Sequence, residues 1–213
     1  MVKFLVVRHG FSLSNKEKTF TGHADIDLSE LGYKQADLVC DYVLKNLHVD
    51  EIYSSDLCRA YHTIEKVAKT LNKEIKMDKD LRELYCGKWQ EVAVSKVAEL
   101  YPEDYAKWQR FDKDMRTTGG ESMMELRERA NRAFDKMARE NEGKTVLVAT
   151  HGGVIRMMQT LWQNIPCEKW GEMKWTTNAS ITTVIYDGDK KEVIEESFDD
   201  YLGELKTQVP KGM

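Results

Sequence analysis

The chain has 213 residues and a formal net charge of −4, with 41% hydrophobic and 32% charged residues. This length and composition predict one sizeable α/β-type globular domain spanning 1–213, and they leave little room for a second. The weakly acidic balance gives no indication of nucleic acid or an anionic membrane as a partner, and no apolar run approaches the roughly 20 residues of a membrane span.

Four scattered cysteines, Cys40, Cys58, Cys86 and Cys167, form no Cys-x-x-Cys pair. This spacing argues against a zinc site or a redox motif and fits reduced thiols. The N-terminus enters a strand pattern without the basic region and hydrophobic segment of a secretory signal. We therefore expect a cytoplasmic protein.

The first predicted element is a buried strand that begins at Val2. Five apolar residues, three of them valine, fill positions 2 and 4–7, and the run stops at Arg8-His9-Gly10. Such a run is typical of a parallel sheet, whose ligands bind beyond the carboxyl ends of the strands. The triplet alone fits a polar turn equally well.

A polar loop follows, and the next predicted element is a helix over 29–47. A short second strand over 50–55 then leads into a helix over about 57–71, whose apolar positions share one side. Arg59 lies in the first turn of that helix. We expect this arginine to act with the helix N-terminus in attracting an anion.

Residues 74–77 predict a weak third strand, and the loop that follows carries Glu83, a candidate buried carboxylate. The pattern over 92–111 is helical and rich in aromatic residues, with a break at Pro102. A glycine loop then precedes a long amphipathic helix over about 123–141.

A second buried strand, over 145–150, also ends in a histidine followed by glycines, at His151-Gly152-Gly153. Parallel strands place their carboxyl ends at one edge of a sheet, so we expect His9 and His151 to converge there.

A helix over about 153–163 follows, and the last elements are strands over 180–186 and 192–195, which flank a hairpin turn. Strands and helices alternate along the chain. This alternation predicts a three-layer α/β/α sandwich around a mostly parallel central sheet.

The candidate site residues Arg8, His9, Arg59 and His151 together suit a tetrahedral oxyanion, because guanidinium groups bind phosphate through paired hydrogen bonds. A neutral histidine can attack phosphorus when an acceptor holds its other ring nitrogen. A carboxylic acid must then protonate the leaving oxygen, and Glu83 is the candidate. The sequence contains no P-loop pattern and no cluster with metal-ligand spacing around these residues.

These residues lie in motifs that resemble the histidine phosphatase superfamily, the fold of cofactor-dependent phosphoglycerate mutase and many small phosphatases. The resemblance covers nearly the whole chain, and its motifs occur in the family's order. The matching segments are Arg8-His9-Gly10 with Asn15, Thr21–Leu28, Ser54–Ala60 with Thr63, Leu81-Arg82-Glu83 with Gly87 and Trp89, Gly119–Ser122, and His151–Arg156.

The resemblance implies a role for each matched residue. His9 would accept the phosphoryl group, and Arg8, Arg59 and His151 would bind its oxygens with help from Asn15. Glu83 would serve as acid for the leaving group and then as base for water. The other substrate-binding positions that it implies are Thr21, Gly22 and Gly152. No metal and no cofactor are implied.

A phosphatase is favoured over the 2,3-bisphosphoglycerate-dependent mutase for two reasons. The chain lacks the characteristic sequence that mutases carry after the proton donor, and it lacks their longer insertion before His151. The expected substrate is a small phosphorylated metabolite, and a cap-like helical insertion over about 92–118 is expected to cover its pocket.

The chain departs from the family's usual residues at Phe11, Ser14 and 90–92, and these departures leave the identity of the substrate open. A non-catalytic phosphate-binding module remains an alternative, and a homodimer is possible.

Overall fold

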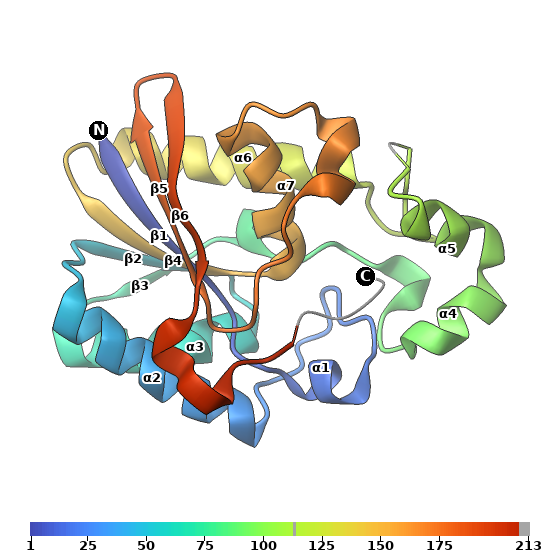
Figure 1. The fold of residues 1–213 in the computed structure, drawn as a ribbon, viewed down its shortest axis with the longest axis horizontal. Helices are drawn as coiled ribbons and strands as arrows, with labels where there is room; N and C mark the ends of the chain where they lie inside the picture. Colours follow the sequence, from blue (N-terminus) through green and yellow to red (C-terminus); the bar gives the residue numbers. More distant parts are fainter. Residues whose placement is uncertain (113, 209–213) are drawn as a thin grey trace.

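The computed structural model describes residues 1–112 and 114–208. They form a central six-stranded sheet with helices on both sides (Figure 1). The strands are β1 (Val2–Arg8), β2 (Glu51–Ser54), β3 (Ile75–Met77), β4 (Thr145–Thr150), β5 (Ile181–Asp187) and β6 (Lys190–Phe198). The helices are α1 (Leu13–Glu17), α2 (Glu30–Asn46), α3 (Cys58–Leu71), α4 (Val94–Leu100), α5 (Pro102–Gln109), α6 (Met123–Glu140) and α7 (Gly152–Trp162). Four 3-10 helices are η1 (Lys79–Leu81), η2 (Gly87–Trp89), η3 (Cys167–Glu172) and η4 (Asp200–Leu205).

The strand order is β3-β2-β4-β1-β5-β6, with the first four strands parallel and β5 antiparallel to β1. In the pairing of β1 with β4, Arg8 lies opposite Thr150. A histidine directly follows the last residue of each strand, and His9 N donates a hydrogen bond of 2.9 Å to Thr150 O. This register brings the two histidines to one edge of the sheet, as expected from the sequence.

The core has two halves, one on each face of the sheet. In β1, Phe4 and Val6 pack in the half formed with α6 and α7, whereas Leu5 and Val7 pack in the half formed with α2 and α3. A strand that is apolar on both faces needs helices on both sides. The predicted α/β/α sandwich is therefore confirmed (Figure 1).

The predicted strands and α-helices agree closely with the observed ones, although β6 is longer than predicted and one α-helix and the 3-10 helices were not predicted. Residues 13–17, expected to lie in a loop, form the short helix α1, whose N-terminus is capped by the Ser12 side chain. A helix of five residues is too short to show apolar periodicity, so the sequence pattern did not reveal it. The predicted break at Pro102 separates α4 from α5, where proline occupies the first helical turn.

None of the helices in the described part of the chain has both the length and the apolar character needed to cross a bilayer.

Replacement of Phe4 should test the half of the core that supports the sheet from the α6 side. The fully buried Phe4 ring contacts the rings of Phe134 and Tyr186 edge-on, with centroids 5.3 and 4.9 Å away. We expect Phe4→Ala to lower the free energy of unfolding by about 3–5 kcal/mol, measured by urea denaturation. Lys3→Ala, at the half-buried neighbouring position, is the control. Equal losses in the two variants would contradict this account of the core.

Candidate active site

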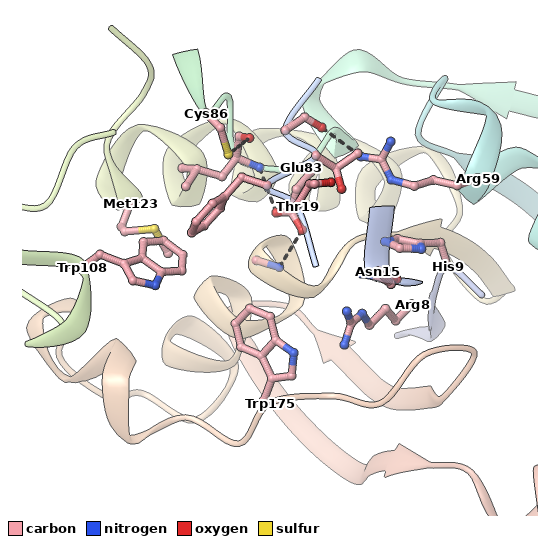
Figure 2. A pocket seen from close by; sticks show the side chains of 15 residues that line it. Arg8, His9, Asn15, Thr19, Arg59, Glu83, Cys86, Trp108, Met123 and Trp175 are labelled. Atoms are coloured by element: carbon pink, nitrogen blue, oxygen red, sulfur yellow. Dashed lines mark hydrogen bonds between the residues drawn. The ribbon is translucent and has the colours of Figure 1, made fainter. Parts of the chain in front are cut away.

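A cavity of about 90 Å³ opens beyond the carboxyl end of β1 (Figure 2). Its walls come from segments far apart in the sequence. They include the strand end, the loop before α2, the start of α3, the loop around Glu83 and the start of α7. The lining residues are Arg8, His9, Asn15, Thr19, Phe20, Thr21, Gly22, Arg59, Glu83, Leu84, Cys86, Trp108, Met123, Gly153 and Trp175.

His9 is almost fully buried at the end of β1, and its ring orientation is set by the backbone. Nδ1 lies 2.7 Å from Gly10 O, an acceptor, so the ring proton belongs on Nδ1 and Nε2 keeps its lone pair. Burial lowers the pKa of His9 well below its usual value, and the positive charges of Arg59 and Arg8 lower it further. His9 is therefore neutral at physiological pH, with Nε2 as a potential nucleophile.

Two buried arginines supply the positive charge of the site. Arg59 donates hydrogen bonds of 2.9 Å to Gly22 O and Ala24 O, and Arg8 donates to Thr176 O. The Nε atoms of both arginines are buried without a hydrogen-bond partner among the described residues. Burial lowers the pKa of Arg8 to about 10, opposed by the charge of Glu83, and lowers that of Arg59. An Arg8 pKa near 10 keeps that guanidinium charged at neutral pH, so it can attract an oxyanion.

His151 is fully buried, and its ring centroid is 5.1 Å from that of His9. Its Nε2 lies 2.8 Å from Ser55 Oγ, which also accepts a hydrogen bond from Leu57 N. If the Ser55 hydroxyl donates to Nε2, the ring proton is on Nδ1, an atom without a partner in the described part of the chain. Burial and the charge of Arg59 lower the pKa of His151 well below its usual value, so the ring can donate as a neutral group.

Glu83 is the only acidic side chain among the lining residues of the described pocket. Its Oε1 accepts from Leu84 N at 2.8 Å, and its Oε2 accepts from Gly153 N at 3.1 Å in the first turn of α7. The loop that carries it is fixed by Arg129, which donates to the carbonyl oxygens of Asp80, Arg82 and Glu83. The carboxyl group is thus held in a defined position beside the two arginines.

Asn15, Thr21 and Gly22, expected to bind substrate, also line the cavity. Asn15 Oδ1 accepts from Asn178 Nδ2 at 3.0 Å, which leaves the amide nitrogen of Asn15 as a donor for a ligand. His151 and Gly152 are not among the lining residues, although His151 adjoins the His9 ring. The structure thus brings the expected residues to one edge of the sheet, where His151 lies beside His9 and Gly152 lies beside Arg8.

Several residues of the site were not singled out in the sequence. Ser55 belongs to a matching segment but was given no role in the site, and it contacts His151. Asn178 donates to the backbone oxygen of His9 at 3.1 Å as well as to Asn15. Trp175 lies against the Arg8 guanidinium, with 5.6 Å between Arg8 Cζ and the centroid of the Trp175 ring. Trp175 and Asn178 belong to the irregular segment before β5, where neither periodicity nor motif marks a position as functional.

Sequence spacing indicated no metal-binding cluster, but the structure brings three potential metal ligands together outside the cavity that contains His9. Within the described ranges, the only group of three metal-ligand side chains is Asp27, Cys58 and His62, whose ligand atoms lie within 4.8 Å of one another. None of the three lines the cavity that contains His9.

Comparison with known proteins places this geometry in context. A model of the histidine phosphatase superfamily (branch 1) matches residues 4–198. Phosphoglycerate mutase-like protein 4 of Arabidopsis thaliana is 33% identical over 88% of this chain and 81% of its own length. Phosphoserine phosphatase 1 of Hydrogenobacter thermophilus is 29% identical over the full length of both chains. A mycobacterial glucosyl-3-phosphoglycerate phosphatase, solved with VO3, superimposes with a TM-score of 0.85 at 25% identity, covering 92% of this chain and 99% of its own.

A titration followed by NMR should test the electrostatics of the site. Because burial and two cations lower the pKa of His9, we expect its ring to stay neutral at pH 6.5, where an unperturbed histidine is half protonated. Arg59→Gln should raise the His9 pKa, since it removes one of those cations. Arg132→Gln, on the outer side of α6, is the control and should have no effect. A His9 ring half protonated at or above pH 6.5 in the unmodified protein would contradict this description.

Proposed function

The chain belongs to the histidine phosphatase superfamily, and from this we propose that it is a metal-independent phosphomonoesterase that acts through a phosphohistidine on His9. One observation carries the proposal. A neutral imidazole, with Nδ1 bonded to a backbone oxygen, lies with two buried guanidinium groups and one carboxyl group in the same cavity. These are the groups that nucleophilic displacement at phosphorus requires.

In the first step, His9 Nε2 attacks phosphorus and forms a P–N bond while the bond from phosphorus to the ester oxygen breaks. The electron pair of the broken bond goes to the leaving oxygen, which takes a proton from the acid form of Glu83. Arg8 and Arg59, together with Nδ1–H of His151 and the Asn15 amide, stabilise the charge on the other phosphoryl oxygens.

In the second step, Glu83, now a carboxylate, takes a proton from water as the water oxygen attacks phosphorus. The P–N bond breaks, its electron pair returns to His9 Nε2, and inorganic phosphate leaves. The carboxyl group ends the cycle protonated and His9 ends it neutral. The backbone donors Leu84 N and Gly153 N hold the carboxyl group in place throughout both steps.

The names of the relatives support hydrolysis and also supply the competing function. Two of them are phosphatases, of phosphoserine and of glucosyl-3-phosphoglycerate, and one is called mutase-like. In a mutase, the phosphoryl group on the histidine returns to a substrate hydroxyl instead of passing to water. We propose only the class of the substrate, which is a small phosphorylated metabolite.

Replacement of the proposed nucleophile should abolish hydrolysis. We expect His9→Ala to lower kcat for p-nitrophenyl phosphate by at least about 10⁴-fold, because no other group in the cavity can form the intermediate. Wild-type turnover should be insensitive to EDTA and inhibited by vanadate. Turnover that survives in His9→Ala, or that EDTA abolishes, would contradict the proposal.

The mutase alternative predicts a different product. Conversion of 3-phosphoglycerate to 2-phosphoglycerate, stimulated by 2,3-bisphosphoglycerate, should be absent or far slower than phosphate release. Both products can be followed by ³¹P NMR in a single sample. Isomerisation that outpaces release of inorganic phosphate would favour the mutase.

Gly153 offers a test of the proton donor without altering the donor itself. A Cβ at this position would lie 2.2 Å from Glu83 Oε1, so Gly153→Ala must displace the carboxyl group. We expect kcat to fall by about 10²-fold or more, while helix α7 gains slightly in stability because alanine favours a helix over glycine. Thermal unfolding provides the control for folding. An unchanged kcat would contradict the assigned role of Glu83.

A further inference from the structure

The cavity has two chemically different ends, and positive charge is confined to one of them. His9, Arg8 and Arg59 gather at one end, whereas Trp108 and Met123 lie at the opposite end (Figure 2). Among the lining residues that the structure describes, the two arginines are the only permanent cations. The proposed function uses both of them for the phosphoryl group.

The end that faces away from His9 has a preformed aromatic wall. The rings of Phe20 and Trp108 meet edge-on with centroids 5.6 Å apart. Behind them, Trp89 packs against Phe20 at 5.1 Å and Trp170 packs against Trp108 at 5.8 Å. Because neighbouring rings fix both wall residues, a ligand meets apolar surface that needs no rearrangement.

Apart from the two arginines and Glu83, the polar side chains that line the cavity are uncharged. Thr19 and Thr21 contribute hydroxyl groups, and the Cys86 thiol donates to Leu84 O at 3.3 Å. Burial raises the pKa of the Cys86 thiol, which keeps it neutral. A carboxylate on the alcohol part of a ligand would therefore find no cation at this end of the cavity.

We propose that this cavity selects phosphomonoesters whose alcohol part is uncharged and largely apolar, such as an aryl group, and discriminates against alcohol parts that carry a carboxylate. The inference rests on the proposed function, because it assigns the arginine end to the phosphoryl group and the aromatic end to the alcohol. A carboxylate at the aromatic end would be desolvated without a cation to pair with it. Phosphoserine and phosphoglycerates both carry such a group.

Three aryl phosphates of matched shape provide the test on the wild-type enzyme. Phenyl phosphate supplies the reference ring, 4-carbamoylphenyl phosphate adds a neutral polar group, and 4-carboxyphenyl phosphate adds a charge of nearly the same size. We expect kcat/KM for the carboxylated ester to be on the order of 100-fold below that for the carbamoyl ester. Equal kcat/KM values for these two substrates would overturn the inference.

A single added cation should weaken this discrimination. Thr19 is a half-buried lining residue, and Thr19→Lys should reduce the preference for the carbamoyl ester by about tenfold, because it gives the carboxylate a partner. Ser95→Lys, on an exposed position of α4, is the matched control with the same change in net charge. An equal change of preference in both variants would show that distant charge controls selectivity and would overturn the inference.

Removal of the wall should weaken binding of the ring more than binding of phosphate. We expect Trp108→Leu to raise KM for phenyl phosphate about tenfold more than it raises Ki for inorganic phosphate, which contacts only the arginine end. Equal increases in the two constants would contradict contact between the ring and Trp108.

The outcomes separate this inference from the proposed function. If wild type hydrolyses none of the three esters, or if hydrolysis survives in His9→Ala, the proposed function itself fails. If hydrolysis depends on His9 but ignores the charge of the ring substituent, the proposed function stands and the preference for uncharged alcohols is wrong.

Discussion

The pairing of β1 with β4 is the constraint on which the rest of the site depends. A histidine follows Arg8 in one strand end and Thr150 in the other. Because Arg8 lies opposite Thr150 in parallel strands, these two histidines lie at the same edge of the sheet. A shift of the register by one residue would turn every side chain of β1 to the other face. The apolar contacts of Phe4 on one face and Leu5 on the other oppose such a shift, so the packing of the core also fixes the distance between the two imidazole rings.

Burial then determines the protonation states of the residues at that edge. The surroundings that exclude water from the imidazole rings keep both of them neutral, and the arginines add to this effect. The arginines remain charged despite burial, because an arginine pKa starts far above neutrality, as the value of about 10 for Arg8 illustrates. The site therefore combines uncharged bases with fixed cations, a combination that exposed side chains would not maintain near neutral pH.

Periodicity and motif order were sufficient for the sandwich and for the convergence of His9 with His151, because both follow from strand ends in a parallel sheet. They did not reveal α1, which is too short for an apolar repeat, or the contacts of Trp175 and Asn178, which lie in an irregular segment. The segment over about 92–118 was expected to cover the pocket, but the sequence did not indicate that Trp108 faces the cavity while Tyr101 packs on Trp89. That choice depends on how the short helices α4 and α5 pack, a matter of tertiary structure.

The guanidinium of Arg59 also holds the loop that precedes α2, through the carbonyl oxygens of Gly22 and Ala24. The same loop caps α3, because Asp25 accepts a hydrogen bond from Cys58 N. Any effect that an anion at Arg59 has on the stability of this loop would therefore be matched by an equal effect of the loop's order on the affinity for that anion. An anion at Arg59 would then be expected to slow amide hydrogen exchange across residues 21–25, in a loop whose Thr21 and Gly22 also line the cavity.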